Sequence, residues 1–99
     1  MAEIEVRSSD GVCYVTGELD LASAAEFHRL VTQMADPSRE VVLDVAGLTF
    51  VDSTGMRAIA RLASSCRYGV VLRRPRPVVQ KVFDIVQMEK MPGIRLEFE

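Results

Sequence analysis

Four residues near the middle of the chain could carry chemistry. Asp52, Ser53, Thr54 and Gly55 follow a strand-like apolar run and precede an amphipathic helical segment. In the simpler interpretation, Asp52 or Ser53 caps the helix, Thr54 assists and Gly55 allows close packing against the strand. In the other, Ser53 carries a phosphate, because free amides and the positive end of the helix dipole favour an anion there.

A phosphate on Ser53 would act mainly on binding. Phosphorylation adds about −1.5 to −2 charges at neutral pH, and Arg57 follows one turn later as an intramolecular partner. The fold can therefore tolerate the group. The loss should arise at a docking protein, which would have to desolvate the dianion or place it beside its own negative groups.

The sequence disfavours catalysis by this serine. A serine nucleophile needs a base and an oriented acid, and the only imidazole, His28, lies inside the first predicted helix beside its apolar stripe. The G-x-S-x-G elbow and the glycine-rich phosphate loops are absent. Cys13 and Cys66 match no metal or redox spacing, and we interpret them as small buried hydrophobes. We therefore predict no enzyme, no cofactor and no metal site.

The elements before this segment follow from residue periodicity. Alternation over 3–7 and turn residues at 8–11 predict an N-terminal hairpin, whose return strand ends near Gly17. Ser23 and Glu26 form a predicted capping box. The helix that it starts ends before Pro37, and its inward stripe consists of Phe27, Leu30, Val31 and Met34.

The remaining elements alternate between strand and helix. The run 41–46 predicts a central strand covered on both faces, and 70–72 and 94–98 predict two further strands. Two helices are expected, one after Ser53 and one over 75–88. Their expected inward residues are Met56, Ile59, Ala60 and Ala63 in the first, and Val78, Val82, Ile85 and Val86 in the second. The order β-β-α-β-α-β-α-β predicts one α/β domain over 1–99, with a mixed, mostly parallel sheet and about three main helices.

Composition limits the classes of function. A net charge of −2 argues against a nucleic-acid binder, although residues 1–56 hold ten acids and three bases and 57–99 hold four acids and nine bases. Arg73, Arg74 and Arg76 form the one basic cluster, which we interpret as a solvated loop leading into a helix, with contact to an acidic partner as the next use. We expect no membrane span, no signal peptide and a cytoplasmic location.

Three stretches of the sequence resemble a known family. "VVLDVAGLTFVDSTGMRAIARL", together with "VTGELDLASAAEF" upstream and "VVLRRPRPVVQKVFDIVQME" downstream, resembles the STAS domain family, particularly the bacterial anti-sigma factor antagonists. The likeness covers essentially the whole chain. It implies a protein that binds an anti-sigma serine kinase when unphosphorylated, releases a sigma factor, and is switched off by phosphorylation; a PP2C-type phosphatase removes the phosphate.

The resemblance also implies roles for individual residues. Ser53 is the phosphorylated serine, and Asp52 orients or recognises the modified site. Thr54 is a neighbouring hydroxyl and Gly55 permits close approach. The expected partner-binding residues are Glu18, Asp20, Asp52, Ser53, Thr54, Gly55, Met56 and Arg57.

One departure and one alternative accompany this resemblance. Relatives often carry a small residue, frequently glycine, where this chain has Arg57, so the partner face here is expected to be more basic. The alternative is a STAS docking subunit without the switch, as in a phospholipid-transport or stressosome-type assembly. The sequence leaves open whether the free protein is a homodimer.

Overall fold

The sheet begins with a hairpin that is closed by two residues in the left-handed region. Asp10 has φ of 51° and Gly11 has φ of 79°, values that suit a two-residue turn whose twist matches that of the strands. The turn joins β1, Ile4–Ser9, to β2, Val12–Leu19, in an antiparallel pair. The computed structural model describes residues 4–98, and within them the predicted N-terminal hairpin is confirmed.

Helical crossovers then build a mixed sheet of five strands in the order β1-β2-β3-β4-β5. All pairs after β1-β2 are parallel. The remaining elements are α1 (Ala24–Met34), β3 (Val41–Val51), α2 (Ser53–Ser65), β4 (Val70–Arg73), α3 (Pro77–Ile85), the 3-10 helix η1 (Met88–Lys90) and β5 (Ile94–Glu97). This confirms the predicted single α/β arrangement and the central place of the strand that starts at Val41.

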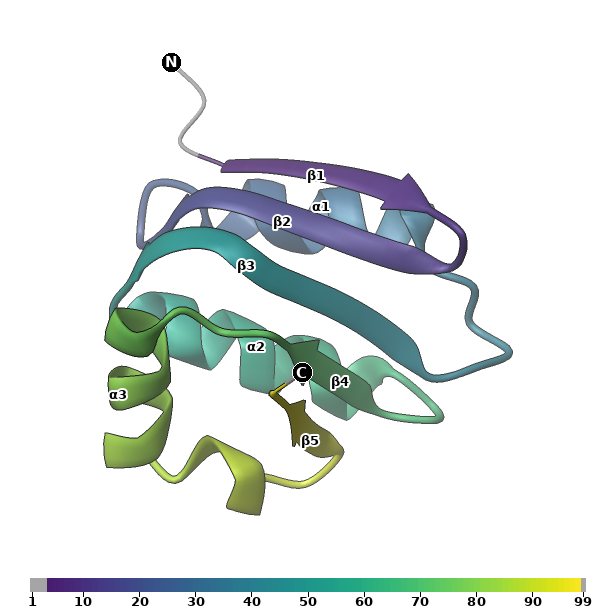
Figure 1. Cartoon of the computed structure of the whole chain (residues 1–99). Helices are drawn as coiled ribbons and strands as arrows, with labels where there is room; N and C mark the ends of the chain where they lie inside the picture. Colours follow the sequence, from purple (N-terminus) through teal and green to yellow (C-terminus); the bar gives the residue numbers. More distant parts are fainter. Residues whose placement is uncertain (1–3, 99) are drawn as a thin grey trace.

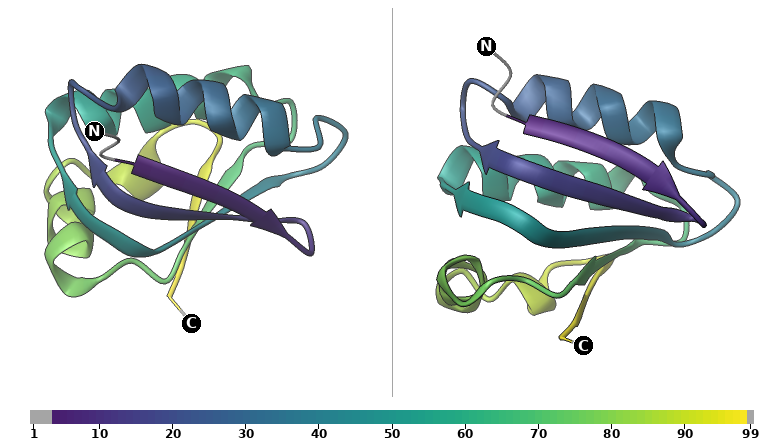
Figure 2. Two further views of the ribbon diagram at one scale, coloured as in Figure 1. Left: turned by 90° about the horizontal axis from the view of Figure 1, so that it is seen from above. Right: turned by 45° about the horizontal axis from the view of Figure 1, so that its top comes forward.

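The helices cover one face of the sheet and one end of it. Figures 1 and 2 show α1 and α2 side by side on the same face of β1, β2 and β3. Helix α3 contacts β3 and lies at the end of the molecule where β3 finishes. The predicted cover of β3 on both faces is incomplete: Asp44 lies under Arg73 and Arg74, whereas Thr49 and Phe50 near the end of the strand are exposed.

The helical stripes of α1 and α2 face the core largely as predicted. Phe27 and Val31 are 1% and 0% exposed, and Leu30 packs against the core from its edge. Met34, at the end of α1, is exposed. Helix α2 buries Met56, Ile59, Leu62 and Ala63, with Ala60 half-buried.

The predicted inward face of α3 is largely wrong. Val79 and Phe83 are the buried residues of this helix, and Val82 packs against the core from its edge. Val78, Ile85 and Val86, which were expected to face inward, are exposed. The helix also begins at Pro77 rather than Pro75, because the chain from Arg74 to Arg76 is still a loop.

The start of α1 differs from the predicted capping box. Ser23 is the N-cap residue, yet its hydroxyl makes no capping bond. The hydroxyl instead donates to the Glu18 carbonyl at 2.7 Å and accepts from the Asp20 amide at 3.0 Å, while Glu26 pairs with Arg29. The polar residues therefore stabilise the loop before the helix rather than its first turn.

Candidate functional site

The DSTG segment lies at the junction of the longest strand and the second helix. Strand β3 runs to Val51, α2 starts at Ser53, and Asp52 between them is the N-cap. The Oδ1 atom of Asp52 accepts a hydrogen bond from the Gly55 amide at 2.9 Å, which satisfies one of the free donors of the helix. Of the two predicted caps, Asp52 is therefore the one that forms, and the hydroxyl of Ser53 makes no capping hydrogen bond.

Close packing between two chain segments fixes the position of Ser53. A Cβ atom on Gly55 would lie 2.3 Å from the Leu19 carbonyl oxygen, so only glycine allows α2 to approach the end of β2 this closely. The Asp52 amide donates to the same oxygen at 3.3 Å. Ser53 is exposed at the first residue of the helix, directly beside this buried contact.

Glu18, near the end of β2, and Asp20, directly after that strand, lie at the same edge as the start of α2. Leu19 pairs with Val51 in the sheet, which brings the residues after both strands to the same edge. The carboxylate of Asp20 accepts from the Ala22 amide at 3.0 Å and from the Ser23 amide at 3.2 Å. Asp20 thus shapes this loop, while the Glu18 side chain is exposed beside it.

The predicted partner-binding residues differ in exposure. Glu18, Ser53 and Arg57 are exposed, and Asp20, Asp52 and Thr54 are half-buried. Gly55 and Met56 are buried, with Met56 only 4% exposed in the core. The structure therefore gathers these residues at one edge but presents only some of their side chains to solvent.

A groove between α1 and α2 opens beside Ser53. Its volume is about 530 Å³, and its lining residues are Leu21, Ala24, Ala25, His28, Thr54, Arg57, Ala58 and Arg61. The floor is apolar and two guanidinium groups border it. His28, predicted to lie inside the first helix beside its apolar stripe, is half-buried on the wall of this groove.

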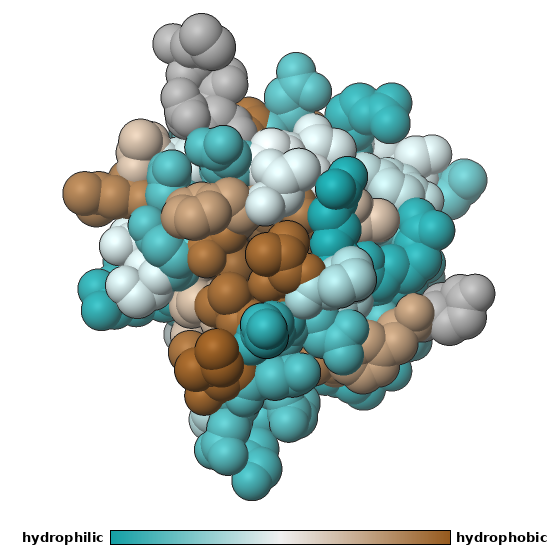
Figure 3. Space-filling view, turned by 60° about the vertical axis from the view of Figure 1, so that its left-hand side comes forward, coloured by the Kyte–Doolittle hydropathy of each residue, from teal (hydrophilic) through white to brown (hydrophobic). Residues whose placement is uncertain are grey.

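The same end of the molecule exposes apolar side chains that the sequence reading placed in the core. Figure 3 shows an apolar area on the side of the molecule where β3 ends and α3 lies. Val78 is 60% exposed and Ile85 is 75% exposed, and both belong to α3. The signal that could have revealed them is that the apolar residues of α3 form a wider arc than a single core-facing stripe needs.

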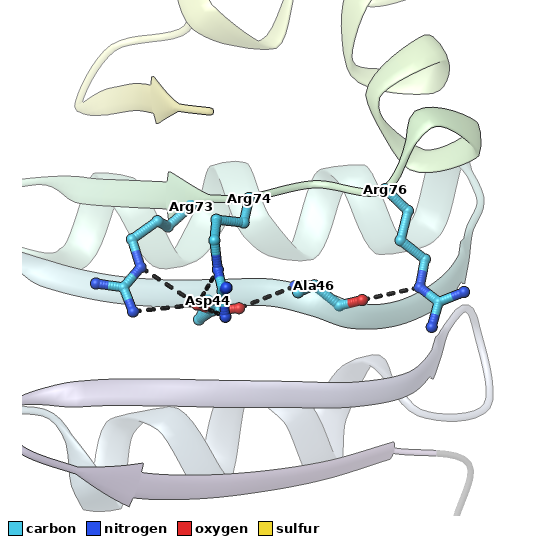
Figure 4. Close-up of polar contacts among 5 residues, drawn as sticks. All are labelled: Asp44, Ala46, Arg73, Arg74 and Arg76. Atoms are coloured by element: carbon cyan, nitrogen blue, oxygen red, sulfur yellow. Dashed lines mark hydrogen bonds and ion pairs between the residues drawn. The ribbon is translucent and has the colours of Figure 1, made fainter. Parts of the chain in front are cut away.

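The basic cluster has a partner that the sequence reading missed. Asp44, 2% exposed on β3, binds Arg73 through its Oδ2 atom at 3.1 Å and Arg74 at 2.9 Å (Figure 4). Its Oδ1 atom accepts from the Ala46 amide at 3.0 Å, and Arg76 donates to the Ala46 carbonyl at 2.8 Å. The arginines thus neutralise a buried carboxylate and hold the loop between β4 and α3 against β3.

The two cysteines are free, and their surroundings favour the protonated thiol. Burial raises the pKa of Cys13, which lies in the core, and of Cys66, which is half-buried. Neither residue has the electropositive setting that activates a thiol. Among residues 4–98, no group of three or more His, Cys, Asp or Glu side chains could hold a metal ion, and no helix could span a membrane.

Comparisons with known proteins identify the family. Three similar solved structures are an anti-sigma factor antagonist from Mycobacterium paratuberculosis, the murine anion transporter Slc26a9 and the anti-sigma factor antagonist SpoIIAA in its unphosphorylated form. The first has a TM-score of 0.66 and 22% identity, covering 93% of this chain and 83% of that chain. The transporter has a TM-score of 0.65 and 24% identity, covering 89% of this chain but only 16% of its own.

SpoIIAA has a TM-score of 0.61 and 20% identity, covering 94% of this chain and 86% of that chain. No curated protein matches the sequence. The family model of the STAS domain matches residues 1–99. The chain therefore belongs to the STAS domain family.

Proposed function

We propose that this protein is an anti-sigma factor antagonist whose activity is switched by phosphorylation of Ser53. In the unphosphorylated form it would bind an anti-sigma serine kinase in the cytoplasm and release a sigma factor, and a PP2C-type phosphatase would restore that form. The main supporting observation is the exposed Ser53 hydroxyl at the first residue of α2, left free because Asp52 provides the cap. Two structurally similar proteins are anti-sigma factor antagonists, which also supports this function.

The surroundings of Ser53 tolerate a phosphate within the free protein. The first amides of α2 and the positive end of its dipole favour an anion, and Arg57 follows one turn later on the exposed side. The unfavourable free energy would therefore appear when a partner covers Ser53. One dianion that the partner does not match can cost more than 1.4 kcal/mol, which is already a tenfold loss of affinity.

Phosphorylation can be tested by intact-mass measurement. The protein is incubated with ATP and a candidate anti-sigma kinase, and the mass should rise by one phosphate. Ser53→Ala should abolish the rise, whereas the matched variant Thr54→Ala should keep it, because Thr54 is half-buried. A phosphate that persists in Ser53→Ala would refute Ser53 as the acceptor.

Binding provides the second test. Ser53→Glu should weaken the complex with the kinase and leave the melting temperature nearly unchanged, since the side chain is exposed and makes no capping bond. Unfolding of this variant would show instead that Ser53 has a structural role. A pull-down with Ser53→Ala as bait would then identify the partner.

A second function is supported by one comparison. The transporter Slc26a9 resembles this chain over 16% of its own length, so this fold also occurs as a small part of a larger protein. The corresponding proposal is a docking subunit without a phospho-switch, in a phospholipid-transport or stressosome-type assembly. An unchanged mass with every candidate kinase, together with stable capture of a non-kinase assembly, would favour this function.

A further inference from the structure

Helix α3 has apolar residues on two of its faces. Val79 and Phe83 point into the core and are 1% and 0% exposed. Val78, Val82 and Ile85 recur at i, i+4 and i+7 and form a second stripe beside the buried one. A helix on the surface of a domain normally has polar residues on its outer side, so this outward stripe calls for a partner.

This outward stripe lies at the same end of the molecule as Ser53. Helix α3 contacts β3, whose last residue is followed directly by Asp52 and Ser53. Among the described residues, exposed large hydrophobic side chains include Val78, Ile85 and Val86 on or directly after α3, and Phe50 near the end of β3. Figure 3 shows the resulting apolar area from this side. The stripe therefore continues the surface on which a protein docked at Ser53 would rest.

Basic side chains flank the stripe, while the edge at Ser53 also carries the carboxylates of Glu18, Asp20 and Asp52. Lys81 follows Val78 by three residues and precedes Ile85 by four, so its exposed side chain borders the stripe. Arg76 is exposed at the N-cap of α3, and Arg57 is exposed on α2. Asp84 is the only acidic residue of α3 and projects away from the stripe by helical geometry. A complementary surface would combine apolar side chains with flanking carboxylates.

We propose that the outward face of α3, formed by Val78, Val82 and Ile85, is a second docking surface for the anti-sigma kinase of the proposed function. The occupant is a segment of that kinase that presents apolar side chains flanked by acidic ones. This inference depends on the proposed function and extends it. The stripe supplies affinity in both phosphorylation states, whereas Ser53 supplies the change in affinity.

The test compares variants of the full chain by calorimetric titration against the kinase that phosphorylates Ser53. The double variant Val78→Ser/Ile85→Ser should bind at least tenfold more weakly, with a melting temperature close to that of the original protein because both side chains are exposed. Tyr68→Ser is the matched control, since Tyr68 is 52% exposed and precedes β4 at the opposite end of the strands; its affinity should not change. Lys81→Glu should weaken binding and reduce its dependence on salt.

The outcomes separate this inference from the proposed function. If Ser53→Glu weakens binding but the double variant binds as tightly as the original protein, the α3 surface is refuted and the switch remains. If the double variant alters only self-association in sedimentation, the stripe contacts a second copy of the chain and the inference is wrong. If no candidate kinase binds or modifies the original protein, both proposals are refuted.

Discussion

Gly55→Ala tests whether backbone contact with β2 requires a glycine in the first turn of α2. The added Cβ would lie 2.3 Å from the Leu19 carbonyl oxygen and 2.8 Å from the Val51 Cγ2 atom, whereas real Cβ contacts essentially never fall below 3.0 Å. Helix and strand would have to separate by at least the difference, about 0.7 Å. Forcing an extra methyl group into such a packed position costs roughly 1–3 kcal/mol.

The same substitution also has a stabilising effect on the helix, so the sign of the measured change shows which effect is larger. Alanine in place of glycine inside a helix stabilises by about 1 kcal/mol when nothing obstructs it. Because the obstructing oxygen belongs to the backbone and cannot rotate away, we expect a packing cost in the upper part of that range, about 2–3 kcal/mol, and hence a net loss of about 1–2 kcal/mol, or at least about 4 °C in melting temperature. Urea unfolding followed by circular dichroism should show a lower midpoint with an unchanged slope.

The control for this experiment is Ser53→Ala, two residues earlier in the same helix. Ser53 is exposed and provides no cap, so its truncation should shift the unfolding midpoint little. A Gly55→Ala protein as stable as the original, or more stable, would refute the reasoning. It would mean that the end of β2 yields easily, and that Gly55 does not fix the place of Ser53.

Three further predictions concern stability and can be checked by the same unfolding assay. Asp52→Ala should lose about 1 kcal/mol because the Gly55 amide loses its cap, and a neutral result would show that the cap is dispensable. Asp44→Ala should lose roughly 1–3 kcal/mol by leaving the Ala46 amide unpaired and two arginines without their buried partner, and Asp44→Asn, which can keep the amide bond, should lose less. Phe83→Ala should cost about 3–5 kcal/mol by opening a core cavity, while Ile85→Ala should change stability by only about 0.5 kcal/mol; equal effects would contradict the assigned faces of α3.

The element order and the place of the DSTG segment could be predicted because local signals agree there. Asp10 and Gly11 suit the hairpin turn, the run from Val41 has the composition of a central strand, and a polar residue before a helical stripe indicates a cap. Each signal depends on residues that are close in the sequence. The structure confirms these predictions in their order, with strand ends a few residues later than expected.

The wrong predictions concern residues whose burial or hydrogen bonding depends on a residue far away in the sequence or on a second apolar pattern. Six apolar residues between Val78 and Val86 offer two stripes on α3, and periodicity alone cannot say which one meets the core. Asp44 interrupts an apolar strand, and only its pairing with arginines 29 and 30 residues later explains its burial. Ser23 satisfies the pattern of a capping box, but its hydroxyl binds the Glu18 carbonyl instead.

The interactions that hold the first turn of α2 in place limit how a switch at Ser53 could work. The Asp52 cap, the Leu19 contact at Gly55 and the buried Met56 hold the first turn of α2 from below, and none of these interactions involves the Ser53 hydroxyl. A phosphate added there has no internal contact to break, so the fold should be the same in both states. The two forms should therefore differ in surface charge rather than in shape, and under the proposed function a partner would distinguish them by its own electrostatic complementarity.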